Sequence, residues 1–236
     1  MFPHAADLPL SPHLNVHYKV ILDQIGPLLT EPRKKRIEEV VTHRNFSTAV
    51  VLEGIYDRGN ISAVMRTAEG LGFANFHLIE TQDKFKNAKG VSRGSDKWVE
   101  IKKWKESKPA IESIKAQGYQ LVVTTLEGGK PIGEVDFTKP TALVLGNEKD
   151  GASPEMIAAA DHRIIVPMNG FVQSFNISVA GAISLYHIYQ QRKAKLGANA
   201  DLTNEQKDIL KAIYYLRTLD SSVDVLERVL SGKVLA

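Results

Sequence analysis

Short apolar runs that alternate with helical patterns occupy the middle of the chain. Runs rich in β-branched residues are typical of buried strands, and they occur at residues 48–52, 76–79, 120–124, 141–145 and 163–166. Apolar positions at helical spacing predict helices between these runs, at residues 60–71, 108–117, 153–160 and 174–191. Strands that alternate with helices indicate a parallel sheet covered on both faces. The pattern therefore predicts an α/β fold with a mainly parallel sheet covered by helices.

Both ends of the chain have a different pattern. Four prolines surround one short amphipathic run in the first thirty residues, which predicts a loosely attached arm. Pro32 then stands where a first-turn proline belongs in a basic helix. Residues 201–236 predict two further helices, each with one apolar face. We therefore expect helical extensions at both ends and three parts: an arm and basic helix at 1–46, an α/β domain at 47–194 and a C-terminal helical extension at 195–236.

Composition removes several classes of protein. The chain has 236 residues and no cysteine, which excludes disulfides, thiolate metal sites, iron–sulfur clusters and thiol nucleophiles. Methyl transfer to a pyrimidine carbon, which usually needs a cysteine adduct, is excluded on the same ground. The apolar runs are far shorter than the roughly 18 residues that cross a bilayer, and the N-terminus does not read as a signal peptide, so we expect a cytoplasmic protein. A net charge of +3 permits a polyanionic partner without requiring one.

The first unusual segment, residues 53–70, follows the first expected strand of the sheet. Gly54 and Gly59 mark a turn, after which Asn60 is expected to cap a helix. Arg66 lies six positions along that helix, about 1.7 turns, so the two side chains meet only if the arginine reaches back toward the N-terminus. A capped amphipathic helix with a surface arginine is the ordinary alternative.

The second segment is a glycine-bounded loop at residues 146–151, directly after a buried strand. Glu148 lies inside it, and Ser153 with Pro154 is expected to begin a helix as N-cap and first residue. Ligands of open α/β sheets bind at the carboxyl ends of strands, where this loop belongs. A plain connection between strand and helix is the alternative, but a carboxylate between two glycines favours a site.

The third segment joins another strand to the helix expected at 174–191. Three small polar residues, Ser174, Asn176 and Ser178, stand at the start of that helix, although a cap needs only one of them. Ala180, Gly181, Ala182 and Ser184 then make one helix face very small. That face suits either close approach of a ligand-binding backbone or tight packing of helices within one chain.

The three segments together resemble a known family. The patterns N-x5-R-x3-G, L-x-L-G-x-E-x2-G and V-P-M-x-G-x3-S-x-N-x-S-V-A are similar to the three motifs of the SpoU, or TrmH-type, RNA 2′-O-methyltransferases of the SPOUT superfamily. The resemblance covers about residues 33–192. Further matches at 34–39, 94–98 and 135–140 resemble the TrmH subgroup, which methylates guanosine-18 of tRNA. One departure is Phe175, where the family usually has leucine.

The resemblance implies a fold and a cofactor that spacing alone does not show. It implies a SPOUT fold with a C-terminal deep trefoil knot, in which the chain after the second motif threads through an earlier loop. The family binds S-adenosyl-L-methionine at this knot. Matching the motifs position by position places Thr124, Gly146, Val166 and Phe175 around the cofactor.

The resemblance also implies roles for catalytic residues. Arg66 would be the central catalytic residue, with Asn60 and Glu148 orienting it and the loops. Ser174 and Asn176 would form hydrogen bonds near the reacting ribose. Because a guanidinium remains protonated at neutral pH, we expect Arg66 to hold a phosphate and the 2′-oxygen rather than to act as a base. The proton acceptor stays open between phosphate and water.

Basic residues outside the three motifs are candidates for binding the phosphates of tRNA. The main candidates are Arg33, Lys34, Lys35, Arg36, Lys89 and Arg93, and Arg44 and Lys97 belong to the same clusters. A solvated helix face is the alternative for the first cluster. We also expect a homodimer, from the resemblance and from the long small-faced helix at 174–191. No metal is expected, and His13 with His17 is interpreted as a surface pair.

Three other functions are alternatives to tRNA methylation. A ribosomal-RNA 2′-O-methyltransferase would share all three motifs and differ only in its substrate. A catalytically silent RNA-binding relative would be expected to lack Arg66 or Asn176, and both are present. A dinucleotide-binding protein would need a G-x-G-x-x-G turn after the first strand, and the sequence has none.

Overall fold

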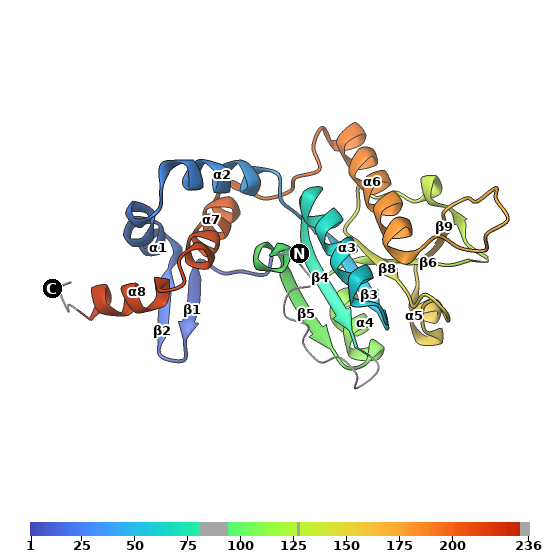
Figure 1. Cartoon of the computed structure of the whole chain (residues 1–236), viewed down its shortest axis with the longest axis horizontal. Helices are drawn as coiled ribbons and strands as arrows, with labels where there is room; N and C mark the ends of the chain where they lie inside the picture. The colour runs from blue at the N-terminus through green and yellow to red at the C-terminus, as the bar shows by residue number, and fades with distance from the viewer. Residues whose placement is uncertain (81–93, 127, 232–236) are drawn as a thin grey trace. The chain divides into compact units, whose positions relative to one another are not determined.

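The computed structural model describes residues 1–80, 94–126 and 128–231 and divides the chain into two compact units (Figure 1). The sheet unit consists of residues 45–199 with Met1. The terminal unit consists of residues 2–44 and 200–236, so the two extensions expected at the ends of the chain belong to one unit. Each unit is described by itself.

A seven-stranded sheet forms the centre of the sheet unit, in the order β5-β4-β3-β8-β6-β9-β7. Neighbouring strands run parallel, which confirms the predicted fold class. The strands are β3 (Asn45–Glu53), β4 (Phe73–Ile79), β5 (Glu100–Trp104), β6 (Gln120–Thr124), β7 (Lys130–Pro131), β8 (Thr141–Leu145) and β9 (His162–Ile165). The sequence pattern missed β5 and β7, which lie at the two edges of the sheet. Edge strands tolerate lysine and proline, so they lack the apolar runs that identify central strands.

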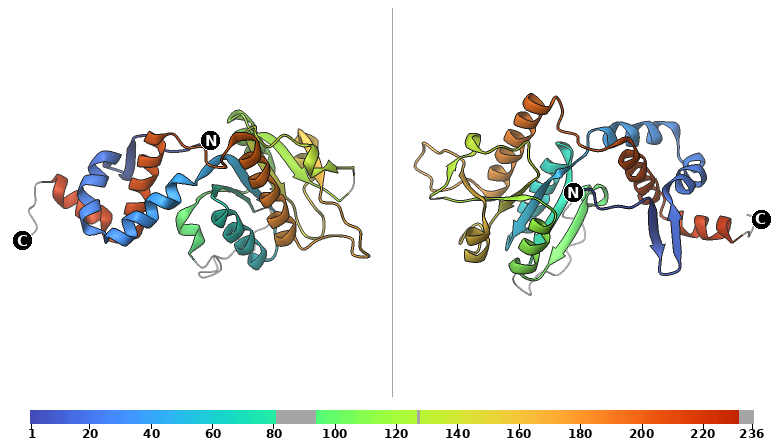
Figure 2. Two further views of the ribbon diagram at one scale, coloured as in Figure 1. Left: turned by 90° about the horizontal axis from the view of Figure 1, so that it is seen from above. Right: turned by 180° about the vertical axis from the view of Figure 1, so that it is seen from behind.

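Helices cover both faces of this sheet. They are α3 (Arg58–Gly70), α4 (Ser107–Ala116), α5 (Pro154–Ala159) and α6 (Ile177–Leu196), with short 3₁₀ turns η2 (Ser95–Trp98) and η3 (Ile132–Glu134). Val50 and Leu52 of β3 face α3 and α6, whereas Ala49 and Val51 face α4 and α5. Figure 2 shows both sides of the sheet. The alternation follows from the two-residue period of a strand.

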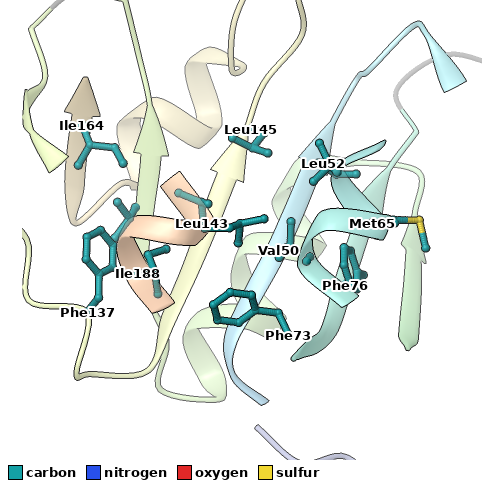
Figure 3. Packing of buried hydrophobic residues seen from close by; sticks show 14 of the residues in the cluster. Val50, Leu52, Met65, Phe73, Phe76, Phe137, Leu143, Leu145, Ile164 and Ile188 are labelled. Atoms are coloured by element: carbon teal, nitrogen blue, oxygen red, sulfur yellow. The ribbon is translucent and has the colours of Figure 1, made fainter. Parts of the chain in front are cut away.

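The larger of the two cores lies between the sheet and the pair α3 and α6 (Figure 3). Met65 of α3 and Ile188 of α6 pack there with Leu143 of β8. Each such side chain stabilises the fold by about 1.5–3 kcal/mol when it is fully buried. This packing fixes the helices whose N-terminal ends carry the first and third sequence motifs.

Close contact between α3 and α6 depends on Gly181. A Cβ atom at this position would lie 3.0 Å from Leu145 Cδ1 and 3.2 Å from Val64 Cγ2. A larger side chain would require Leu145 and Val64 to shift. The small face of α6 at this position therefore serves packing within the chain, one of the two readings that the sequence left open.

Two predicted helix starts are wrong. The N-cap of α3 is Asp57, whose carboxylate accepts a hydrogen bond from Gly59 N at 2.7 Å, so Asn60 lies inside the first turn. The N-cap of α6 is Asn176, so this helix begins three residues later than expected and extends to Leu196. In both cases several neighbouring polar residues can cap, and the local sequence does not decide between them. Ser153 caps α5 as predicted, accepting from Met156 N at 3.2 Å.

The chain crosses itself beside β9. This strand lies between β6 and β7, which are both parallel to it and are separated along the sequence only by residues 125–129. The connection must therefore pass from one side of β9 to the other. It does so at Ile164, whose carbonyl accepts from Thr125 N at 2.9 Å. A Cβ atom on Gly129 would lie 2.8 Å from the Ile164 carbonyl carbon, so only glycine fits there.

The terminal unit joins a β-hairpin to helices from both ends of the chain. Its elements are β1 (Asp7–Ser11), β2 (Leu14–His17), α1 (Tyr18–Ile25), η1 (Gly26–Leu28), α2 (Glu31–Thr42), α7 (Asn204–Thr218) and α8 (Ser222–Leu230). Helix α1 packs on α7 and α8, and Ile21 and Ile25 are fully buried. The loosely attached arm expected at residues 1–30 is therefore wrong, because its amphipathic run finds a partner some 190 residues away. Pro32 does lie in the first turn of α2, as predicted.

Arg44 does not belong to the basic helix, because α2 ends at Thr42. Only 1% of Arg44 is exposed, and its Nε donates a hydrogen bond to Tyr214 Oη at 3.0 Å. Its guanidinium also lies 5.7 Å from the centroid of the Tyr214 ring. The expectation that Arg44 contacts RNA is wrong, because its buried side chain bonds to Tyr214 and so joins α7 to the segment that follows α2.

Candidate active site

A chain of hydrogen bonds joins the three sequence motifs in the sheet unit. Asn60 Nδ2 donates to Glu148 Oε1 at 2.8 Å, and Asn176 Nδ2 donates to Asn60 Oδ1 at 3.2 Å. The backbone N–H of Tyr56 donates to the other oxygen of Glu148 at 3.4 Å. We call Glu148, Asn60 and Asn176 the motif network. One residue comes from each motif, although they are separated by 88 and 116 positions along the chain.

The side-chain hydrogen bonds of the motif network are all donated in one direction, from Asn176 through Asn60 to Glu148. Ser178 donates to Asn176 Oδ1 from its backbone N at 2.9 Å and from its hydroxyl at 2.5 Å. Each amide then donates onward, and the last acceptor is the Glu148 carboxylate. A charged acceptor makes the final bond the strongest, and it fixes which way both amides point. Asn60 and Asn176 are thereby held in one orientation without any bound partner.

The second motif forms a tight hairpin after β8, at residues 146–152, which we call the motif-two hairpin. Asn147 and Gly151 exchange backbone hydrogen bonds of 2.8 and 3.0 Å. A Cβ atom on Gly146 would lie 2.2 Å from Ala152 N, so the two legs of the hairpin touch and no side chain fits between them. Gly151 has φ 73°, a conformation that favours glycine.

The residues expected to bind a cofactor lie at the carboxyl ends of neighbouring strands. Thr124 ends β6, Gly146 follows β8 and Val166 follows β9, and these strands are adjacent in the order β8-β6-β9. Thr124 Oγ1 donates to the carbonyl of Val144 at 3.0 Å and ties β6 to β8. Phe175 is half-buried directly before the N-cap of α6. Open α/β sheets bind ligands at this edge.

Glu53 is a polar residue of this region for which the sequence pattern predicted no role. It ends β3, only 2% of it is exposed, and it accepts hydrogen bonds from Ser107 and Ser153. An acidic residue at the end of an otherwise apolar strand is the signal that could have drawn attention to it. A buried carboxylate requires partners, and the sequence alone does not name them.

Comparison with known proteins decides the family. A sequence profile described as "SpoU rRNA Methylase family" matches residues 47–186. The chain belongs to the SpoU family. The match includes all three motifs and confirms the resemblance drawn from them.

Three proteins similar to this chain share one name. The tRNA (guanosine(18)-2'-O)-methyltransferase of Aquifex aeolicus is 37% identical over 80% of this chain and 91% of its own length. The protein of the same name from Borreliella burgdorferi is 38% identical over 83% of this chain and 91% of its own. The Escherichia coli K12 protein of that name is 35% identical, covering 68% of this chain and 71% of its own.

Solved structures of the SpoU family agree with the fold. The A. aeolicus "TrmH/SpoU tRNA modifying enzyme" is 36% identical and superposes with a TM-score of 0.71, covering 80% of this chain and 98% of its own. The SpoU methyltransferase AviRb from Streptomyces viridochromogenes, in complex with the cofactor AdoMet, is 28% identical with a TM-score of 0.55. It covers 61% of this chain and 57% of its own.

Two predicted catalytic residues lie apart from the motif network. Arg66 is exposed on α3, nearly two turns beyond Asn60. Ser174 is exposed in the segment that leads to α6. The structure therefore joins Asn60, Glu148 and Asn176, and leaves Arg66 and Ser174 facing solvent.

The basic residues expected to bind RNA divide into three groups. Arg33, Lys35 and Arg36 are exposed on α2, and Arg36 lies 3.4 Å from Glu39. Lys34 forms an ion pair with Glu31, and the hydrogen bond between them raises the pKa of the Lys34 ammonium. Lys89 and Arg93 lie outside the described residues. Lys97 is exposed in η2, 5.8 Å from the centroid of the Trp98 ring.

Within residues 1–80, 94–126 and 128–231, no group of three or more His, Asp or Glu side chains is placed to hold a metal ion. His17 caps α1 by accepting from Lys19 N at 3.3 Å, so it has a structural role. No described helix has both the length and the apolar character that a membrane span requires.

Proposed function

We propose that this SpoU-family protein transfers a methyl group from S-adenosyl-L-methionine to the ribose 2′-hydroxyl of guanosine-18 in tRNA. The motif network carries the proposal, because it brings one residue of each family motif into a single hydrogen-bonded unit. The relatives that are named for this reaction support the choice of nucleotide. Their matches to this chain cover up to 91% of the relatives' own length. A protein that modifies tRNA in this way is expected in the cytoplasm.

The residues at the carboxyl edge of the sheet fit the cofactor. Gly146 follows β8 at the carboxyl edge of the sheet, where its peptide groups would contact the cofactor. Thr124 and Val166 would flank it, and Phe175 would face the adenine. AviRb, a relative with the same domain, was solved with this cofactor. When bound, the cofactor supplies a methyl group on a positively charged sulfur that needs no metal.

Arg66 would act on the RNA side of the reaction. Its exposed guanidinium carries five N–H donors in a planar fork, which matches a phosphate and a neighbouring 2′-oxygen. Held there, it would stabilise the negative charge that develops on the oxygen as the proton leaves. The motif network would hold the N-terminal ends of α3 and α6 in fixed positions relative to each other. Ser174 and Asn176 would bind near the ribose. Most of the rate enhancement would then come from positioning.

The crossing beside β9 supports a trefoil knot. After β9 the chain continues past the connection that crosses this strand at Ile164. It then reaches α6, on the face of the sheet opposite to α5. A knot would hold the loops of the second and third motifs together without further bonds. A crystal structure traced through residues 120–180 would test it, and an unthreaded path would contradict it.

An exposed apolar stripe on α6 supports a homodimer. Val179, Ile183 and Tyr186 are 45%, 38% and 54% exposed and lie four and three residues apart, so they share one helix face. Apolar side chains in such a row are typical of interfaces between chains. A second copy of this chain would cover them. Sedimentation of an active monomer at micromolar concentration would contradict this part of the proposal.

The exposed basic residues of α2 would bind tRNA. Arg33, Lys35 and Arg36 would contact phosphates, as would Lys34 after exchanging Glu31 for the nucleic acid. Such contacts supply affinity that depends strongly on salt and carries little information on sequence. Lys89 and Arg93 stay predictions from the sequence.

Nucleoside mass spectrometry tests the proposed reaction. A tRNA transcript is incubated with the protein and S-adenosylmethionine, and 2′-O-methylguanosine is expected at position 18. A transcript that carries 2′-deoxyguanosine at position 18 is the control and should remain unmodified there. Methylation of a ribosomal-RNA transcript in place of tRNA, or of a base in place of the ribose, would overturn the proposal.

A further inference from the structure

Two consecutive residues at the end of β3 hold both legs of the motif-two hairpin. The Glu53 carboxylate accepts from Ser153 Oγ at 2.7 Å and from Ser153 N at 2.8 Å, just beyond the second leg. The carbonyl of Gly54 accepts from Asn147 Nδ2 at 2.6 Å, at the first leg. The hairpin is thus held at both ends by residues at the carboxyl end of β3.

The Glu53 carboxylate is buried among neutral donors. A third hydrogen bond reaches it from Ser107 Oγ at 2.5 Å, and the residue is 2% exposed. Ser107 is the first residue of α4, and Ser153 is the N-cap of α5. The positive ends of two helices therefore lie beside this carboxylate and help to stabilise its charge. A neutral side chain would lose that attraction and leave donors without an acceptor.

The motif-two hairpin is rigid within itself and is attached to its surroundings by these tethers, by β8 and by the bonds of Glu148 to Asn60 and Tyr56. The backbone bonds between Asn147 and Gly151 and the contact of Gly146 with Ala152 fix its internal shape. The bonds between Glu53 and Ser153 set the position of its second leg. A shift at Ser153 passes through Ala152 directly to the Gly146 backbone.

We propose that Glu53 is a positioning residue for the cofactor: its buried carboxylate fastens Ser153 and thereby sets the Gly146 backbone against S-adenosylmethionine. This inference rests on the proposed function, because it assigns the cofactor to the carboxyl edge of the sheet. Glu53 acts through the hairpin and does not touch the reacting atoms. Its loss should therefore weaken cofactor binding more than it changes tRNA binding.

Two matched substitutions separate positioning from general stability. Glu53→Gln keeps the size of the side chain and removes the charge that holds Ser153. Ser107→Ala removes one hydrogen bond of the same carboxylate and leaves the bonds to Ser153 in place. Calorimetry with S-adenosylhomocysteine should show about tenfold weaker binding for Glu53→Gln, equivalent to about 1.4 kcal/mol, and a change within about twofold for Ser107→Ala. The KM for tRNA should stay within about twofold in both variants.

Each outcome has one meaning. Equal cofactor affinity in wild type and Glu53→Gln would overturn the inference, as would affinity losses that follow the loss of thermal stability in both variants. Should Glu53→Gln fail to fold, Ser153→Gly takes its place, because it removes the hydroxyl bond to Glu53, keeps the bond to Ser107, and puts at the N-cap of α5 a residue that is tolerated there. A smaller loss of cofactor affinity, about threefold, is then expected, because the backbone N–H of residue 153 still donates to Glu53. A wild-type protein that does not bind S-adenosylhomocysteine would instead contradict the proposed function.

Discussion

The two units of this chain use their polar residues in opposite ways. In the sheet unit, the motif network bonds one polar side chain to the next, so each amide has one orientation before any substrate arrives. In the terminal unit, Arg33 and Lys35 of α2 project into solvent, Lys34 and Arg36 form ion pairs with residues three positions away, and Glu38 pairs with Lys211 of α7. Chemistry at a ribose needs atoms in fixed places, whereas attraction to phosphate needs only charge within about 8 Å. Substitutions in the first region should therefore change rates, and those in the second should change affinity.

Replacing Arg66 should give the largest effect. Arg66→Ala is expected to lower kcat by about a thousandfold, because it removes the donor that stabilises the developing oxyanion. Cofactor affinity should stay nearly unchanged, since Arg66 faces the RNA. Single-turnover methylation and calorimetry measure the two quantities. Arg66→Lys keeps the charge without the planar fork and should fall between wild type and Ala; cofactor binding lost in Arg66→Ala would show that the roles are wrongly assigned.

A methyl group at Gly146 should damage cofactor binding before it affects tRNA binding. In Gly146→Ala the new Cβ would lie 2.2 Å from Ala152 N and 2.6 Å from Ala152 Cα, so the legs of the hairpin must part. We expect cofactor affinity to fall by more than about tenfold. Gly133→Ala is the control, because its Cβ would have no neighbour closer than 3.9 Å. Normal calorimetric binding by Gly146→Ala would contradict the placement of the cofactor.

Acid should destabilise the sheet unit through His77. Burial, together with the charge of Lys102, lowers the pKa of His77 to about 4 from its usual 6.5. Its Nδ1 accepts a hydrogen bond from Trp104 Nε1 at 3.0 Å, which requires the neutral ring at that nitrogen. Between these two pKa values the unfolded chain binds more protons than the folded one. The free energy of unfolding should therefore fall by up to about 1.4 kcal/mol per unit as the pH drops from 6.5 toward 4.

Denaturant titrations at several pH values measure this slope. His77→Gln keeps an acceptor for Trp104 and does not titrate, so its unfolding free energy should change less steeply between pH 6.5 and 4. Identical slopes in the variant and in wild type would mean that other groups cause the acid sensitivity.

Neutralising the basic helix should give the smallest effect on catalysis. Replacing Lys34, Lys35 and Arg36 together by glutamine should raise the KM for tRNA about tenfold and leave kcat unchanged, because phosphate contacts bind ground and transition states alike. The slope of log affinity against log salt should flatten by about one unit for each lost contact. Binding titrations at several salt concentrations measure that slope.

A triple variant with the same change of charge controls this experiment. Lys103, Lys105 and Lys108 are exposed in the sheet unit, in or beside β5 and α4. Their replacement by glutamine should leave the salt slope closer to that of wild type. Equal slopes for wild type and the α2 variant would make α2 a solvated face and direct attention to the C-terminal helices.

Local features were predictable wherever neighbouring residues decide them. The bounds of β6 and β8 are those expected, because a buried central strand must be continuously apolar. The Ser153 cap was expected for the same kind of reason, since proline in a first turn leaves few choices of cap. At the start of α3 the expected cap, Asn60, is wrong, because Asp57, a residue type that caps equally well, stands three positions earlier.

The sequence by itself determined the α/β class, the central strands and the residue types that meet in the three motifs. Only the tertiary structure decided that Glu53 holds Ser153, that Arg44 is buried on Tyr214 and that the connection crosses β9 at Ile164. Periodicity reports which face of an element is buried, because apolar area leaves water whatever the partner is. It does not report which distant residue supplies a hydrogen bond or which backbone passes close by, since those depend on where separate elements meet.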